Sequence, residues 1–307
     1  MWGFAEVERS AAQEVEPGMR LYGYLPPTSY VVLTPTDAGA YGLVDASPHR
    51  AALPSSYQRY LATGSDPFYR ADTEDLQTLL RPLFSTAFLI DDQLVDDRLT
   101  ARGPVVISSA SSKTAIGAAY LLAQRDEVEL VGLTSTRNVE FVERLGIYGQ
   151  AVTYDAIASL DRGPATFVDI AGDPAVRLAV HAHYGEELVY SMTVGATHWQ
   201  EFGAGGGIGA GGGIGAGGGI GAGGDQLPGP SPTFFFAPDR RAKRSEEWGG
   251  PAELARRISA AWHPFCEWTR SWLEVMDGHG FEAVQRAYLD VLDGRVDAKT
   301  AHVLTLD

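Results

Sequence analysis

Small and hydroxyl-bearing residues crowd the stretch from Ser108 to Gly117, whose sequence is SSASSKTAIG. A short apolar run at residues 105–107 precedes it and an alanine-rich stretch follows, so we expect a strand, a tight loop and the first turn of a helix. Unpaired amides and the helix dipole attract phosphate to such a turn, and small side chains let it approach. We therefore predict a phosphate-binding loop. The residues assigned to it are Ser111, Ser112, Lys113, Thr114, Ala115, Ile116 and Gly117.

Two glycine-rich phosphate motifs match this loop only in part. Of the G-x-G-x-x-G dinucleotide fingerprint, only the last glycine has a counterpart, Gly117. Ser112 stands where a P-loop has the glycine before its Lys-Thr pair. A tight strand–helix turn that binds no ligand therefore stays open as the alternative.

The next apolar run ends in hydroxyl-bearing and basic residues, LTSTRN at 133–138. An Asp or Glu at this place usually hydrogen-bonds the ribose 2′-hydroxyl of NAD, and here there is none. The planar, always-charged guanidinium of Arg137 suits a 2′-phosphate instead. We predict NADP(H) as the cofactor, with Thr134, Ser135 and Arg137 at the 2′-phosphate. The alternative is a solvated loop in which residues 134–136 cap a helix.

A few other polar residues could take part in proton transfer. His198 follows an expected strand whose carboxyl end faces the cofactor, so it is our candidate proton donor, although a packed histidine beside Trp199 is an equal alternative. Asp91 and Asp92 could pair as acid and base, but such a pair more often caps a helix or faces water. The basic run at residues 240–244 could attract an anionic ligand, but we interpret it as a solvated helix start.

Strands and helices alternate from Gly103 onward, which predicts βαβ units and a parallel sheet. We expect its strands at 105–107, 128–133, 167–170 and 188–194, and its helices at 115–125, 139–145 and 174–183. Residues 1 to about 100 are β-rich, with strands expected within 17–27 and at 31–33 and a helix at 72–83. Two further helices are expected at 252–276 and 281–292.

Composition narrows the classes of partner and compartment. The 307 residues carry 39 acidic and 24 basic side chains, a net charge of −15, which argues against nucleic acid or an anionic membrane as the main partner. The single cysteine, Cys266, permits no internal disulfide and no cysteine metal cluster. His181 and His183 are two residues apart on an expected helix, so their side chains point to different faces and we reject a metal site there. With no long apolar run and no signal-peptide pattern, we expect a cytoplasmic protein.

One segment has a composition unlike the rest. The hexapeptide GGGIGA begins at Gly205 and recurs at Gly211 and Gly217. Glycine loses the most backbone entropy on ordering, and one isoleucine in six residues does not offset that loss. We interpret this glycine-rich repeat as a flexible surface insert rather than a phosphate cradle.

Several stretches resemble a known superfamily. The sequences PGMRLYGY at 17–24 and SYVV at 29–32 resemble the G-D-R-V-x-G and Y-x-V-V stretch of the medium-chain dehydrogenase/reductase superfamily. Residues 105–124 and 130–146 resemble the cofactor segments of its zinc-free quinone oxidoreductase branch. The chain is more closely similar to a family catalogued as a domain of unknown function, on PLFST at 82–86, SSASSKTA at 108–115, GATHW at 195–199 and FFFAPD at 234–239.

The resemblance implies an α/β fold with a Rossmann-like parallel sheet domain, an incomplete β-rich GroES-like domain and C-terminal helices. Together with the glycine-rich insert at 201–226, it divides the chain into four parts. The other three are a partial GroES-like catalytic domain at 1–100, a Rossmann-like NADP-binding domain at 101–200, and a strand and helical segment at 227–307 that completes the catalytic domain. The zinc-binding Cys and His patterns are missing, so we expect no metal. The chain is also expected to start inside the first domain, truncated at its N-terminus.

The implied function is an NADP(H)-dependent, zinc-free oxidoreductase that transfers hydride to a carbonyl, enone or quinone-type substrate. Two alternatives stay open: a nucleotide-binding protein of the same fold without redox activity, and a non-redox lyase or hydrolase that uses Asp91, Asp92 or His198. We expect a small-molecule substrate as partner, with no nucleic acid and no membrane, and we leave a homodimer open.

Overall fold

The computed structural model describes residues 1–194 and 227–306. The chain forms two compact units, one made of Met1–Arg81 and Ala255–Asp307 and the other of Pro82–Leu254. Helix α2 (Glu74–Asp96) and helix α7 (Pro251–Thr269) each begin in one unit and end in the other. The candidate site lies in the Pro82–Leu254 unit.

This unit is built on a parallel sheet of six strands in the order β11-β10-β9-β6-β7-β8. Its strands are β6 (Val105–Ile107), β7 (Leu130–Thr134), β8 (Gln150–Thr153), β9 (Ala165–Asp169), β10 (Leu188–Thr193) and β11 (Thr233–Phe234). Its helices, besides the end of α2, are α3 (Lys113–Ala123), α4 (Val139–Arg144), α5 (Pro174–Tyr184) and α6 (Ala237–Glu247). This is the strand order of a doubly wound, Rossmann-like sheet.

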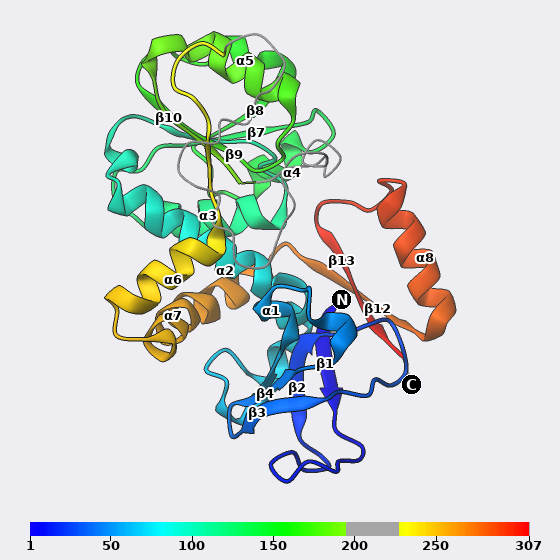
Figure 1. Cartoon of the computed structure of the whole chain (residues 1–307). Coiled ribbons are helices and arrows are strands. Elements are labelled where there is room, and N and C mark those ends of the chain that lie inside the picture. The colour runs from blue at the N-terminus through cyan, green and yellow to red at the C-terminus, as the bar shows by residue number, and fades with distance from the viewer. Residues whose placement is uncertain (195–226, 307) are drawn as a thin grey trace. The chain divides into compact units, whose positions relative to one another are not determined.

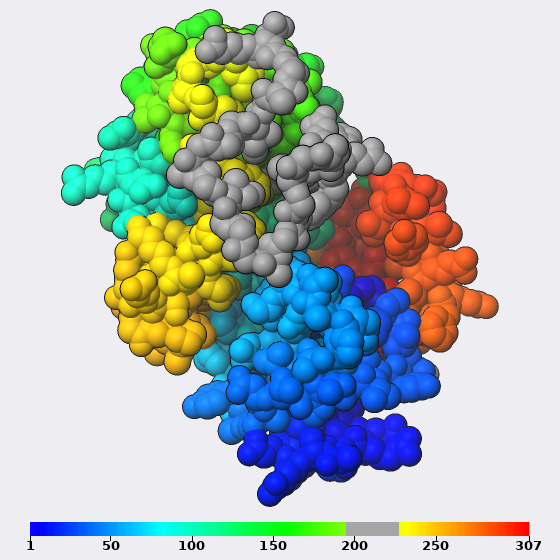
Figure 2. All heavy atoms as spheres, in the orientation of Figure 1, coloured from blue at the N-terminus to red at the C-terminus, as the bar shows by residue number. Residues whose placement is uncertain are grey.

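Helices cover both faces of the sheet, with α5 on one side and α3 on the other (Figure 1). One core joins Val106, Leu133 and Phe167 of the strands to Val176 and Val180 of α5. Because both faces are covered, the central strands are apolar runs rather than alternating patterns. Helix α6 lies at the surface of the unit, where its yellow spheres are in view (Figure 2).

The other unit contains an antiparallel sheet in the order β1-β2-β5-β4-β3, which fits a GroES-like domain. Its strands are β1 (Trp2–Glu6), β2 (Arg20–Tyr24), β3 (Pro35–Gly39), β4 (Gly42–Asp45) and β5 (Arg59–Ala62), with the short helix α1 (Ser55–Gln58) before β5. Leu21, Leu43 and Tyr60 form its core. After α7 come β12 (Glu274–His279), α8 (Gly280–Leu292) and β13 (Thr300–Thr305), and β12 pairs with β13 in parallel.

Most elements expected in the Pro82–Leu254 unit are confirmed within a few residues, but three expectations elsewhere are wrong. Residues 31–33 form no strand, because Val32 is 78% exposed and the hairpin strand begins only at Pro35. The helix expected at 72–83 starts at Glu74 and continues through Pro82 to Asp96, because apolar side chains keep their helical spacing beyond the proline. The helix expected at 252–276 ends at Thr269, and Glu274–His279 is a strand.

Candidate functional site

Strand β6 lies in the middle of the parallel sheet, between β7 and β9. The chain builds outward from β6 through β7 to β8, and then returns to add β9, β10 and β11 on the other side. The loops that follow β6 and β9 therefore lead away in opposite directions. Ligands of doubly wound sheets bind at this place, the switch point, outside the carboxyl ends of the strands.

The loop after β6 is fixed by hydrogen bonds to its neighbours. Ser109 has a positive φ of 52°, a conformation more common for glycine, and its amide donates to the Tyr154 hydroxyl at 3.1 Å. The Ala110 amide donates to the Leu133 carbonyl at 2.9 Å, and the Ser112 amide donates to the Ser109 carbonyl at 2.8 Å. The loop is therefore pinned to β7 and to the segment after β8.

Helix α3 begins with a capped turn that still has unused donors. Ser112 is the N-cap, and its hydroxyl accepts from the Ala115 amide at 3.3 Å while its carbonyl accepts from the Ile116 amide at 2.9 Å. The amides of Ser111 and Thr114 have no acceptor among residues 1–194 and 227–306. Two backbone donors thus stay available at the positive end of an eleven-residue helix.

The other residues assigned to this loop have different surroundings. Lys113 is half-buried, and burial lowers the pKa of its ammonium group. The side chains of Ala115 and Ile116 are fully buried, and their amides are used inside the helix. Gly117 lies where α3 meets α2, since a Cβ there would be 3.0 Å from the Ala87 Cβ.

The loops after β6 and β7 contact each other through Ser111. Its Oγ accepts from Asn138 Nδ2 at 3.1 Å, and Thr134 Oγ1 lies 3.5 Å away. Thr134 is buried at the end of β7, Ser135 is half-buried, and Arg137 is exposed. The structure therefore brings the two predicted groups, the loop at Ser111 and the residues Thr134, Ser135 and Arg137, to one edge of the sheet.

On the β9 side of the switch point lies the carboxylate of Asp169. Asp169, at the end of β9, has no exposed surface; its Oδ1 accepts from Ser108 Oγ at 2.8 Å and from the Gly172 amide at 3.0 Å. Arg177 of α5 donates to Asp169 Oδ2 at 2.9 Å. Ser108 Oγ in turn accepts from the Ile170 amide at 2.9 Å. The arginine balances the buried carboxylate, so the switch point holds no uncompensated negative charge from this pair.

Sequence reasoning missed Asp169, Arg177, Tyr154 and Asn138. An acidic residue at the end of an apolar strand, followed by an arginine in the first turn of the next helix, is a signal that could have identified the first two. The Tyr154 contact with Ser109 spans 45 residues, and no local pattern announces it.

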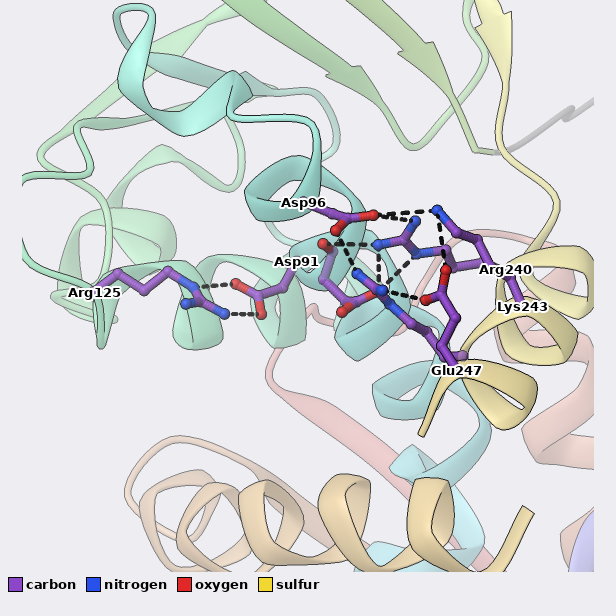
Figure 3. Close-up of polar contacts among 8 residues, drawn as sticks. Asp91, Asp96, Arg125, Arg240, Lys243 and Glu247 are labelled. Atoms are coloured by element: carbon purple, nitrogen blue, oxygen red, sulfur yellow. Dashed lines mark hydrogen bonds and ion pairs between the residues drawn. The ribbon is translucent and has the colours of Figure 1, made fainter. Parts of the chain in front are cut away.

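Asp91 and Asp92, which could pair as acid and base, are instead held by different arginines. Figure 3 shows Asp91 against Arg125. Both oxygens of Asp91 accept from Arg125, at 2.8 and 2.6 Å, and burial raises the pKa of Asp91. Asp92 accepts instead from Arg240 and Arg244, at 2.6 and 2.7 Å. The two acids lie inside α2, so the expectation that they cap a helix is wrong.

The basic run at 240–244 is also not a solvated helix start. Arg240 is only 7% exposed, because α6 packs against α2 and places this guanidinium on the carboxylates of Asp92 and Asp96. Figure 3 shows these contacts. The candidate proton donor His198 lies outside the described residues.

The part of the chain that the structure describes contains neither a cluster of metal ligands nor a membrane-spanning helix. No group of three or more His, Cys, Asp or Glu side chains among these residues is arranged to hold a metal ion. None of the described helices is both long and apolar enough to cross a membrane.

Solved structures with a similar fold are oxidoreductases and related nucleotide-bound proteins. The yhdH oxidoreductase of Salmonella enterica, in complex with NADP, has a TM-score of 0.50 and 13% identity over 98% of this chain and 80% of its own. Bacillus subtilis yhfP, with NAD bound, has a TM-score of 0.52 and 13% identity over 100% and 80%. S. aureus TarJ, in complex with NADPH, has a TM-score of 0.52 and 7% identity over 99% and 80%.

These identities show a shared fold, which agrees with the Rossmann-like and GroES-like fold that the sequence resemblance implies. None of the curated proteins matches the sequence. The family model described as "Protein of unknown function (DUF2855)" matches residues 1–297, and the chain belongs to that family.

Proposed function

We propose that this chain binds NADP(H) at the switch point of its parallel sheet and acts as a zinc-free oxidoreductase. The observation that carries the proposal is the pair of unused amides, Ser111 and Thr114, at the start of α3. They lie at the edge of a sheet whose strand order is typical of dinucleotide-binding domains. Proteins with a similar fold have been solved with NADP, NAD and NADPH.

The residues present fit the charge of such a cofactor. The two amides and the α3 dipole favour a pyrophosphate, and Arg177 cancels the charge of Asp169, which would otherwise repel it. Lys113 is placed in the first turn of the same helix. Thr134, Ser135 and Arg137, at the end of β7, would hold the 2′-phosphate that distinguishes NADP from NAD.

The bound cofactor supplies a hydride, and the protein supplies binding, orientation and exclusion of water. The proposed acceptors are carbonyl, enone and quinone-type substrates. His198 keeps its proposed role as the proton donor that follows β10.

A second candidate is a nucleotide-binding protein of this fold without redox activity. It is favoured by the engagement of Ser108, Asp169 and Arg177 with one another, which occupies these polar groups at the switch point. Oxidation of NADPH across quinones, enones and aldehydes decides between the two candidates: binding without oxidation selects the second.

The experiment that tests NADP(H) binding uses the cap of α3. Asp and Asn both cap a helix about as well as Ser. Ser112→Asp therefore keeps the helix intact but places a negative charge beside the two unused amides, and Ser112→Asn is its neutral control. We expect Ser112→Asp to lower the NADPH affinity at least tenfold in calorimetric titration, with the melting temperature unchanged and Ser112→Asn close to wild type. Equal weak binding of NADPH and NADH by the wild type, or no binding, would overturn the proposal.

A further inference from the structure

A pocket of about 340 Å³ lies within the Pro82–Leu254 unit, and none of the residues assigned to the cofactor lines it. Gln93 and Asp97, at the end of α2, form one wall. Asp239, Arg240 and Lys243, on α6, form another, and the three phenylalanines at 234–236 complete the lining. Its volume is at the lower end of the range for small-molecule sites, which combine aromatic walls with a few polar groups.

The basic side chains of the lining are already neutralised. Arg240 pairs with Asp92 at 2.5 Å and with Asp96 at 3.1 Å. Lys243 pairs with Asp96 at 3.3 Å and with Glu247 at 3.8 Å. Figure 3 shows Arg240 and Lys243 directed at these carboxylates.

Arg244 completes this network between α2 and α6. It pairs with Asp92 at 2.7 Å, with Asp96 at 2.9 Å and with Glu247. Three cations thus face three carboxylates, and the network has no net charge. An anionic ligand would have to compete with these carboxylates for Arg240 and Lys243.

The two remaining acids of the lining, Asp97 and Asp239, form no ion pair among the described residues. Neither Asp97 nor Asp239 has a side-chain hydrogen bond or ion pair with any residue in the described ranges, and both are exposed. Asp97 directly follows the last residue of α2, where the helix dipole disfavours a negative charge. Asp239 lies in the first turn of α6, where the dipole of that helix partly offsets its charge. The pocket therefore carries two carboxylates that form no ion pair with a described residue, and their field attracts a cation.

Aromatic rings supply the second half of a cation site. The rings of Phe234 and Phe236 are stacked at 25° with their centroids 6.4 Å apart, and Phe236 is 50% exposed. Ring faces attract ammonium groups, and the same rings provide an apolar surface for a hydrocarbon arm. From the pocket, its two unpaired carboxylates and its rings, we infer that this chain has a second ligand site, which binds a small organic ammonium ion with an apolar or aromatic arm.

Phenethylammonium is a suitable probe, and phenylacetate has nearly the same skeleton with the opposite charge. In calorimetric titration of the full-length chain, we expect phenethylammonium to bind at one site, more weakly as salt increases, and phenylacetate not to bind. In NMR spectra, the shifted resonances should belong to the phenylalanines at 234–236. None of the residues assigned to the cofactor lines the pocket, so we expect that saturating NADPH does not displace the amine.

Asp97→Asn with Asp239→Asn should lower the phenethylammonium affinity at least tenfold, and Phe236→Ala should lower it severalfold. The matched control is Asp161→Asn with Glu186→Gln, which removes the same charge from exposed positions of the same unit and should bind as the wild type does. Thermal melts report the folding of every variant. Binding of phenylacetate, equal loss in the control pair, full binding by the Asp97/Asp239 variant, or no binding of the amine by the folded wild type would overturn the inference.

Discussion

Ser108 Oγ donates a hydrogen bond of 2.8 Å to Asp169 Oδ1, and this bond spans the switch point of the parallel sheet. The same hydroxyl accepts from the Ile170 amide, so one small side chain joins the loops that follow β6 and β9. The Asp169 carboxylate is fully buried, and Arg177 compensates its charge. The spacing of the two loops between which a dinucleotide would lie is thus set by a buried polar network rather than by apolar packing.

Removal of this hydroxyl tests the network. Ser108→Ala leaves the Ile170 amide without its acceptor and Asp169 without one donor, so we expect the free energy of unfolding to fall by about 1–3 kcal/mol. We also expect NADPH to bind about tenfold more weakly, because the two loops lose their fixed spacing. Urea unfolding and calorimetric titration measure the two effects.

Ser159→Ala is the control for that variant. The Ser159 hydroxyl makes one exposed bond to the Ala156 carbonyl at 2.7 Å, so its loss should change neither quantity appreciably. An unchanged stability of Ser108→Ala, or a loss of equal size in Ser159→Ala, would show that the bond across the switch point stabilises the fold no more than an exposed serine bond does.

Arg137 tests the choice between the two nicotinamide cofactors. Arg137→Glu places a negative charge at the end of β7, where it repels a 2′-phosphate but can accept from a 2′-hydroxyl. We expect the NADPH affinity to fall by at least tenfold while the NADH affinity stays the same or rises, as measured by titration of both. Arg144→Glu makes the same charge change on an exposed side chain of α4 and should leave the ratio of the two affinities unchanged. A parallel loss for both cofactors would contradict the 2′-phosphate assignment.

The sequence predicts the centre of the parallel sheet well, because a strand buried on both faces is a compact apolar run. The peripheral strand β8 is missed for the same reason: only Val152 of its residues is buried, so Gln150–Thr153 lacks that signal. Strands β12 and β13 pair with each other and have mixed exposure, so the first was assigned to a helix and the second was not predicted.

The candidate site, too, is predicted by the sequence only in part. That Ser111 and residues 134–138 meet follows from the sequence, because the carboxyl ends of neighbouring parallel strands share one edge. Contacts that depend on strand order or helix docking do not follow from it. Ser108 and Asp169 are 61 residues apart, and Arg240 and Asp92 are 148 apart. The basic run was therefore assigned to solvent, although its partners lie on α2.

Gly132 in β7 is expected to tolerate no side chain. A Cβ at this position would lie 2.9 Å from the Ala110 Cβ and 3.0 Å from the Tyr148 ring, so the loop after β6 would have to move. We expect Gly132→Ala to destabilise the chain by about 1–3 kcal/mol in urea unfolding and to weaken NADPH binding. At Gly149 the nearest contact of a Cβ is 3.5 Å, so Gly149→Ala should be close to neutral. Equal stability of the two variants would contradict the close packing beneath the loop.

Asp96 and Asp97 offer a matched test of the ion-pair network, since they are neighbours and only Asp96 has partners. The guanidinium of Arg244, above all, lowers the pKa of Asp96 from its ordinary value of 3.8. A carboxylate whose pKa is lower in the folded state than in the unfolded state stabilises the fold fully at pH values above its unfolded-state pKa. This stabilisation is lost as the pH falls through the folded-state pKa. At neutral pH we expect Asp96→Asn to cost about 1–2 kcal/mol, a figure reduced for the partial exposure of the carboxylate.

Urea unfolding at a series of pH values should show the difference in stability between wild type and Asp96→Asn narrowing below pH 3.8. There the unfolded wild-type chain takes up a proton at Asp96 while the folded chain still holds this carboxylate ionised. Asp97→Asn should show no loss at any pH, because its carboxylate has no partner in the described chain and opposes the dipole of α2. High salt should shrink the Asp96 effect only modestly, since Arg240 and Arg244 are 6% and 11% exposed and therefore poorly screened. A gap that stays constant down to low pH would mean that Asp96 stabilises α6 by packing rather than by charge.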